Sequence, residues 1–304
     1  MKVINITKRQ LRKMLPLNLS RSIINKEGKL YIRDYKQKYG HFQDLLKIYN
    51  NQSESYIADK VAVITKLIAT FESLDMPELV TPTSLVSLDG EISGFAMPFI
   101  EDNTNLALLL NNPKVTLSQK IKLLKEILNI LIKVQDSHEL DGKFFLGDIH
   151  EANFIWDITE QTVRAVDMDS SYFSGGFISV SKVTTLNYLL EGFPNKYILD
   201  DESGKFIPNK DITSVSFIYM LLNVLSGCND SHHWSYNEFY NYLSFLEKKG
   251  LSKELLDIIA NLYTAGNIDI YNPELLDGID KNKDYTMTLA RIHKSNGGYY
   301  QNEK

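Results

Sequence analysis

The most informative segment of the chain reads Gly147-Asp148-Ile149-His150-Glu151-Ala152-Asn153-Phe154, and Val166-Asp167-Met168-Asp169 follows it. It combines an aspartate, an asparagine five positions later, and a second aspartate beyond a short apolar hairpin. Carboxylate and amide oxygens in this order can orient a hydroxyl group and hold Mg²⁺ on the phosphates of a nucleotide. A single aspartate beside a glycine is usually a loop or cap residue. Only the combination of Asp148, Asn153 and Asp167 indicates a functional site.

The composition limits the classes of protein to consider. The 304 residues suit one two-lobed enzyme or two ordinary domains, and 43% hydrophobic content is ample for a large core. A net charge of -5 creates no field that would attract nucleic acid. Apolar runs such as residues 217–222 are far too short to span a membrane. The single cysteine, Cys228, fits a reducing compartment, so we expect a cytoplasmic protein with neither nucleic acid nor membrane as a partner.

The hydrophobic pattern predicts a small β-rich region before a larger helical one. We expect strands within residues 20–50, a helix at 53–74, and two strands at 84–88 and 92–99 joined by Asp89-Gly90, a strong hairpin signal. Helical spacing of apolar residues predicts further helices at 117–135, 211–226, 236–248 and 252–264, with short strands at 154–156 and 163–168 between them.

The polar segment and this order of elements resemble the protein-kinase-like superfamily, which includes protein kinases and aminoglycoside-type small-molecule kinases. The resemblance implies an α+β, bilobal fold, with an N-terminal extension at 1–19, a β-rich N-lobe containing one main helix at 20–100, and a helical C-lobe at 101–304. It also implies ATP and Mg²⁺ as cofactors, and transfer of the γ-phosphate to a hydroxyl of a protein or a small molecule.

The resemblance assigns a role to each polar residue. Asp148 matches the catalytic aspartate that accepts or aims the proton of the attacking hydroxyl. Asn153 and Asp167 match the two Mg²⁺ ligands. Asp169 could be a second metal contact, although a cap or turn carboxylate is the commoner role. Lys47, inside the apolar strand Leu45-Leu46-Lys47-Ile48-Tyr49, matches the lysine that holds the α- and β-phosphates.

A lysine inside an apolar strand is costly unless a carboxylate pairs with it. We expect the partner of Lys47 to be an acidic residue on the helix at 53–74. Asp59 is the first choice and Glu54 the competitor, while Glu72 lies too far along the helix.

The segment Gly94 to Glu101 resembles the hinge that contacts adenine. Its candidate ATP-binding residues are Met97, which would line the back of the pocket, Pro98 and Ile100, whose backbone carbonyl and N–H would bond the adenine edge, and the intervening Phe99. Ile155 would form the floor of the adenine pocket. Ordinary core packing is the alternative for each apolar residue.

The motifs leave the subclass open. Gly147 and His150 favour the small-molecule branch, because many protein kinases carry arginine and lysine at these positions. The segment Asp211 to Gly227 resembles a protein-kinase helix that begins with a buried aspartate, although a helix-capping aspartate would satisfy the same pattern.

The glycine-rich loop of protein kinases is missing. The corresponding turn, Asn25-Lys26-Glu27-Gly28, contains one glycine and an acidic residue, which would repel phosphate. The alternative to an active phosphotransferase is therefore a pseudokinase that serves as a nucleotide-binding or protein-interaction module. A third interpretation is an unrelated α+β protein in which the motifs coincide by chance.

Overall fold

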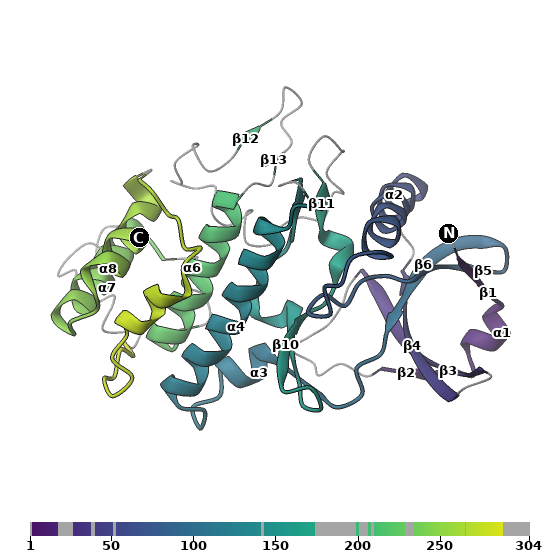
Figure 1. Ribbon diagram of the computed structural model, residues 1–304, viewed down its shortest axis with the longest axis horizontal. Coiled ribbons are helices and arrows are strands. Elements are labelled where there is room, and N and C mark those ends of the chain that lie inside the picture. Colours follow the sequence, from purple (N-terminus) through teal and green to yellow (C-terminus); the bar gives the residue numbers. More distant parts are fainter. Residues whose placement is uncertain are drawn as a thin grey trace, which may run out of the picture. The chain divides into compact units, whose positions relative to one another are not determined.

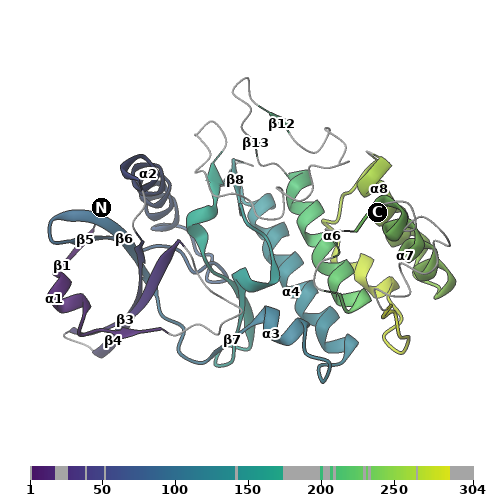
Figure 2. The ribbon, with the colours of Figure 1, turned by 180° about the vertical axis from the view of Figure 1, so that it is seen from behind.

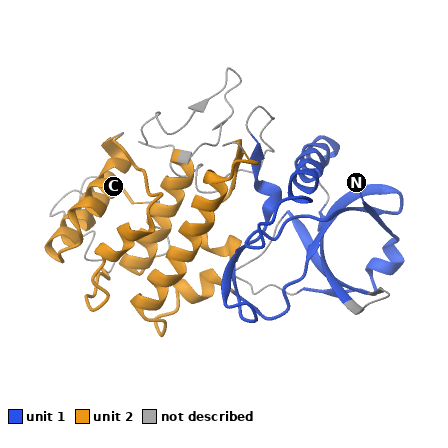
Figure 3. Ribbon diagram, in the orientation of Figure 1, with its two compact units in different colours: residues 1–104, 155–181 blue, residues 105–154, 182–304 orange. Residues whose placement is uncertain are grey.

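The computed structural model describes residues 2–17, 27–37, 40–50, 53–140, 143–173, 199–200, 206–207, 210–228, 231, 234–264 and 266–287. It is a mixed α+β structure with an N-terminal β-sheet and a helical C-terminal region (Figures 1 and 2). The chain divides into two compact units (Figure 3). Unit 1 comprises residues 1–104 and 155–181, and unit 2 comprises 105–154 and 182–304. The strand expected at 20–24 lies outside the described residues.

Unit 1 is built on a six-stranded sheet in the order β1-β5-β6-β4-β3-β2. The strands are β1 (Val3–Ile6), β2 (Leu15–Pro16), β3 (Gly28–Gln37), β4 (Gly40–Tyr49), β5 (Ser84–Leu88) and β6 (Glu91–Pro98). β1 pairs with β5 in parallel, and the other neighbouring pairs are antiparallel. The helix α1 (Lys8–Leu11) follows β1.

The expected N-terminal extension at 1–19 is wrong, because this stretch supplies two strands of the sheet. Val3 lies opposite Leu85, and Ile4 and Ile6 are buried in the core. β1 lies 78 or more positions before its partner in the sequence, so no local turn signal marked the pairing.

The hairpin between β5 and β6 is confirmed. Asp89 and Gly90 adopt φ angles of 54° and 98°, and positive φ at both central residues is the geometry of a type I′ turn. Its twist matches that of the flanking strands, which explains the strength of the Asp-Gly signal.

The main helix of unit 1 is α2 (Glu54–Phe71). The side chain of Ser53 caps its first turn by accepting a hydrogen bond from the Tyr56 N–H. Its inner face buries Ile64, Leu67 and Ile68 against β5 and β6. Lys60 lies on the same buried face, four residues before Ile64.

Residues 155–181 belong to unit 1, although a lobe boundary near residue 100 would place them in the second lobe. The strands β9 (Phe154–Asp157) and β10 (Thr162–Ala165) form a three-stranded sheet with β7 (Asn103–Asn105). Backbone bonds of Ala165 to residues 78 and 80 attach this hairpin to the segment before β5. The 3₁₀ turn η2 (Met168–Ser170) and β11 (Tyr172–Phe173) follow.

Unit 2 is mainly helical. Its elements are α3 (Leu106–Leu110), α4 (Leu117–Asp136), β8 (Phe144–Phe145), η1 (Glu151–Asn153), β12 (Leu199–Asp200), β13 (Phe206–Ile207), α6 (Lys210–Ser226), α7 (Tyr236–Lys248), α8 (Lys253–Thr264) and η5 (Pro273–Gly278). Thr116 and Gln119 form a capping box at the start of α4, as its sequence indicates. α4 packs against α6, and α7 against α8. Within the described part of the chain, none of the helices combines the length and apolar character needed to cross a bilayer.

Candidate functional site

Lys47 lies at the centre of a charged cluster in unit 1. It sits on β4 between Leu30 of β3 and Phe95 of β6, and its side chain is 0% exposed. Its ammonium Nζ lies 2.6 Å from Asp167 Oδ1, 2.8 Å from Glu27 Oε2 and 2.9 Å from Asp169 Oδ1. Lys47 and Asp167 are 120 residues apart in the sequence, and the fold brings them into one ion pair.

The predicted partner of Lys47 was wrong. All three carboxylates that contact it come from outside α2, whereas Asp59 and Glu54 are exposed. Successive residues of a helix point about 100° apart, so burial of Lys60 turns its neighbour Asp59 toward solvent.

Asp169 is a fully buried partner of two lysines. Its carboxylate accepts hydrogen bonds from Lys47 Nζ and from the Tyr49 hydroxyl, the latter at 3.0 Å, and lies 3.5 Å from Lys60 Nζ. Its backbone carbonyl also accepts a bond from Lys60 Nζ at 3.0 Å. Burial by itself would raise the pKa of Asp169, but the charges of Lys47 and Lys60 outweigh it and hold this pKa well below its usual value. The expectation of a cap or turn carboxylate was therefore wrong.

Asp167 is the more accessible of the two aspartates, with 30% of its side chain exposed. Its backbone is left-handed, at φ 61° and ψ 45°, which aspartate tolerates better than most residues. Burial and the neighbouring charge of Asp169 raise the pKa of Asp167 to about 6, against the opposing charge of Lys47.

Glu27 and Lys60 are site residues that the sequence did not reveal as partners. Glu27 accepts a bond from the Tyr56 hydroxyl, and its Oε1 lies 2.8 Å from Lys60 Nζ. Lys60 is 0% exposed. One signal for Lys60 was present, because it occupies the apolar helical stripe of Ile64 and Leu67, where a lysine needs a buried partner.

The predicted catalytic segment forms a compact loop in unit 2. The Asn153 side-chain Nδ2 donates to the backbone carbonyl of Asp148 at 2.8 Å and closes the loop. The His150 ring accepts from the Ala152 N–H through Nδ1, and its Nε2 lies 3.4 Å from Asp148 Oδ2. Asn105, which caps α3, donates to the Ala152 carbonyl at 2.7 Å and fixes η1 in place.

The carboxylate of Asp148 has one oxygen whose bonding is incomplete. Its Oδ1 is buried, and no hydrogen-bond partner for it is present among the described residues. Buried polar atoms are almost always paired, so an orphaned carboxylate oxygen indicates a place where a donor, such as a substrate hydroxyl, binds.

The donor chemistry of the predicted metal ligands fits Mg²⁺. Asp167 offers a carboxylate, and Asn153 offers its amide oxygen because its nitrogen is already engaged. Within the described ranges, no group of three or more His, Cys, Asp or Glu side chains could hold a metal alone. Mg²⁺ usually retains waters and phosphate oxygens and needs only one or two protein ligands. Asn153 belongs to unit 2 and Asp167 to unit 1.

The candidate adenine-binding residues occupy β6 and β9. Met97 is buried in β6, and Pro98 ends that strand with an exposed side chain. Phe99 and Ile100 are half-buried beyond it, and Ile155 is buried in β9. Their nucleotide contacts stay a prediction.

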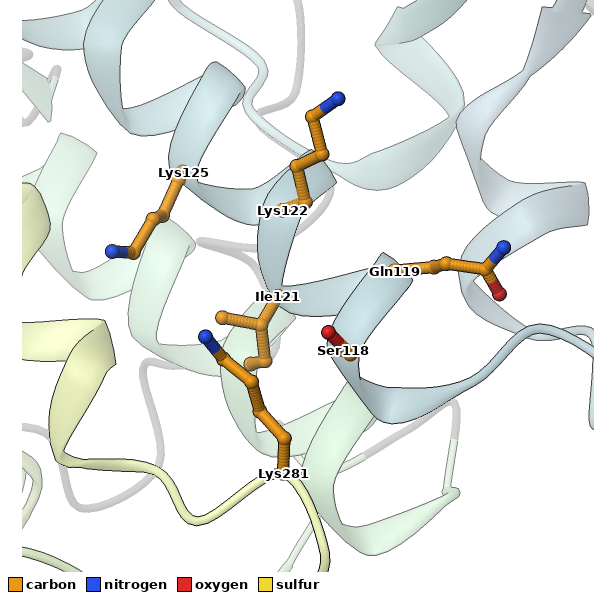
Figure 4. A pocket seen from close by; sticks show the side chains of 6 residues that line it. All are labelled: Ser118, Gln119, Ile121, Lys122, Lys125 and Lys281. Carbon is orange, nitrogen blue, oxygen red and sulfur yellow. The ribbon is translucent and has the colours of Figure 1, made fainter.

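A separate pocket of about 330 Å³ lies at the start of α4 (Figure 4). It is lined by Ser118, Gln119, Ile121, Lys122, Lys125 and Lys281. Asp277 lies 2.7 Å from the Lys125 ammonium and 3.9 Å from that of Lys281, so its single carboxylate offsets part of the charge of the three lysines. None of the lining residues belongs to the predicted site.

Comparison with known proteins gives no family assignment. No protein-family model matches the chain, and no curated protein matches it either. The function is therefore inferred from two groups of residues, the lysine–carboxylate cluster around Lys47 and the loop of Asp148 and Asn153.

Proposed function

We propose that this protein is an ATP- and Mg²⁺-dependent phosphotransferase with a bilobal protein-kinase-like fold, acting on a hydroxyl of a protein or small molecule. The observation that carries the proposal is the ion pair of 2.6 Å between Lys47 Nζ and Asp167 Oδ1. The resemblance assigns these two residues to one ligand, the nucleotide with its metal. Their meeting in unit 1 across 120 residues of sequence is what such a shared ligand requires.

Each residue has a defined role in this proposal. Lys47 would bind the α- and β-phosphates of the nucleotide. Asp167 would hold Mg²⁺, and the resemblance gives Asn153 the same role; the metal would neutralise charge on the phosphates. The hinge residues Met97 to Ile100, with Ile155, surround the adenine.

Asp148 acts on the acceptor. Its orphaned Oδ1 supports this role, because a substrate hydroxyl that donates to this oxygen is both oriented and activated for attack. The oxygen of that hydroxyl forms a bond to the γ-phosphorus, the bond to the leaving ADP oxygen breaks, and the hydroxyl proton passes to Asp148. Positioning and charge neutralisation supply most of the catalysis in phosphoryl transfer.

One observation favours a second candidate function, a pseudokinase that serves as a nucleotide-binding or interaction module. Three carboxylates already satisfy the ammonium of Lys47, and Glu27 lies where the resemblance puts a phosphate-binding loop. A protein freed from catalysis could retain such a closed cluster as a structural core.

Thermal unfolding with ATP, with and without Mg²⁺, tests the first proposal. Ligand at a hundredfold excess over Kd should stabilise the folded state by roughly 2.7 kcal/mol. We expect a Mg²⁺-dependent rise in Tm for the wild type and for Asp34→Ala, a matched exposed aspartate on β3. Asp167→Ala should lose the Mg²⁺-dependent part of the rise. An equal Mg²⁺-dependent rise in Asp167→Ala would contradict the metal assignment, and no response to any nucleotide would favour the interaction module.

A further inference from the structure

Two fully buried lysines share the carboxylate of Glu27 in unit 1. Glu27 Oε2 lies 2.8 Å from Lys47 Nζ, and Glu27 Oε1 lies 2.8 Å from Lys60 Nζ. The two ammonium groups come from different elements, β4 and α2, and both are 0% exposed. A single bidentate anion therefore bridges two cations inside the unit.

The carboxylates around these lysines differ in accessibility. Asp169 is 0% exposed and binds both lysines and the Tyr49 hydroxyl, so it is fixed. Glu27 is 21% exposed. Asp167 is 30% exposed and pairs with Lys47, whereas Glu27 contacts both lysines, so Glu27 is the accessible carboxylate whose place between them an anion from solvent can take.

The surroundings of Glu27 also suit exchange. Among the described residues, the cluster holds three carboxylates and two ammonium groups, an excess of one negative charge. When Glu27 leaves, the positive charges of the two lysines equal the negative charges of the two aspartates. Gly28, the residue after Glu27, lies close to the β4 backbone, because a Cβ there would lie 2.8 Å from the Ile48 carbonyl oxygen. This close approach places the Glu27 carboxylate beside Lys47 of β4.

We propose that Lys47 and Lys60 together form a two-lysine site for a polyphosphate oxyanion, and that the Glu27 carboxylate occupies this site until the anion displaces it. Lys60 thereby becomes a second phosphate-binding residue, and Glu27 an internal competitor. The inference rests on the proposed function in one respect, because it takes the physiological anion to be the phosphate chain of the nucleotide.

The competition has a measurable consequence. When the binding-competent state is only a fraction of the population, the apparent affinity falls by that fraction. Glu27→Gln keeps the shape of the side chain but removes its charge, so it should bind anions about tenfold or more tightly than the wild type. The probe is inorganic tripolyphosphate without Mg²⁺, titrated calorimetrically into the full chain at low ionic strength, with ATP titrated in parallel.

The role of Lys60 is tested in the Glu27→Gln background, because Lys60→Met alone would leave three carboxylates around the single ammonium of Lys47 and could unfold the protein. The double variant Glu27→Gln/Lys60→Met removes both members of one ion pair and preserves the net charge of the cluster. It should lose the gain in tripolyphosphate affinity. Glu27→Gln/Lys66→Met, with an exposed lysine of the same helix replaced, should retain it.

A further control makes the result specific. Asp34→Asn makes the same change in charge on an exposed residue of β3 and should leave the affinity unchanged. The proposal is overturned if Glu27→Gln binds tripolyphosphate no more tightly than the wild type, or if the Lys60→Met double variant binds as tightly as Glu27→Gln. Tripolyphosphate binding with this pattern but no ATP binding would support the anion site and reject the proposed function. If ATP binds and neither the Glu27 nor the Lys60 substitutions alter its affinity, the proposed function is supported and the two-lysine anion site is rejected.

Discussion

At the scale of single residues, Asp167 is held in the folded protein at a cost to stability. Burial and Asp169 raise its pKa to about 6, above the value near 3.9 of an unfolded chain. Between these values the folded state binds more protons than the unfolded state, so the stability from this group falls as pH rises through that window. The charges that act on it are those of Lys47 and Asp169.

Asp167→Asn should therefore raise the Tm of the nucleotide-free protein at pH 7 to 8, because it removes the excess negative charge of the cluster. The difference from wild type should shrink as pH falls below about 4, where the aspartate is protonated in both states. Circular dichroism melts from pH 4 to 8 measure this, with Asp34→Asn as the exposed control. A variant less stable than wild type at pH 7.5, or a difference that does not change with pH, would show that Asp167 stabilises the fold.

The sequence identified Lys47 and Asp167 because each lies in a recognisable local pattern. It did not identify Glu27, Lys60 or Asp169 as their partners, since a buried ion pair depends on which side chains distant elements bring together. Lys60 came closest to being predictable. A lysine within an apolar helical stripe requires a buried anion, and only the identity of that anion depends on the tertiary structure.

At the scale of elements, the close pairing of β4 and β6 depends on Gly94. Gly94 lies opposite Ile48, and a Cβ at this position would fall 2.0 Å from the backbone carbonyl oxygen of Lys47. No side-chain rotation can relieve a clash with backbone, so the strands would have to separate beside the lysine.

Gly94→Ala should lower the free energy of unfolding by about 1–3 kcal/mol, the usual range for overpacking a filled site. Urea denaturation followed by circular dichroism measures the change, and Ser93→Ala on the same strand is the control. A Gly94→Ala variant within about 0.5 kcal/mol of wild type, the range of ordinary surface changes, would mean that the two strands separate at little cost.

Local sequence signals predicted individual helices and turns better than they predicted the boundary between the two units. The Asp89-Gly90 turn and the capping box at Thr116 are encoded within a few residues, and the structure confirms the hairpin and α4. β1 was missed because its partner strand lies about 80 residues away. Residues 155–181 join unit 1 through backbone bonds to the segment before β5, and no local pattern could indicate them.

At the scale of the whole molecule, the proposed functions of the two polar clusters belong to different compact units. The lysine–carboxylate cluster is built entirely from unit 1, and the loop of Asp148 and Asn153 entirely from unit 2. Phosphate binding and activation of the acceptor should therefore be separable by mutation. A change in one cluster can leave the internal contacts of the other intact.

Asp148→Asn should reduce ATP turnover by about 10²- to 10⁴-fold, the usual contribution of a positioned acid or base. The same variant should retain the full ATP- and Mg²⁺-dependent rise in Tm, because Lys47 and Asp167 keep all their contacts within unit 1. ADP release during basal hydrolysis measures turnover. The control Asp277→Asn, at an exposed aspartate of unit 2, should leave turnover and the Tm response unchanged.

Full turnover in Asp148→Asn would show that this residue takes no part in the chemistry. Loss of the Tm response would instead show that the Asp148 carboxylate itself contributes to nucleotide binding.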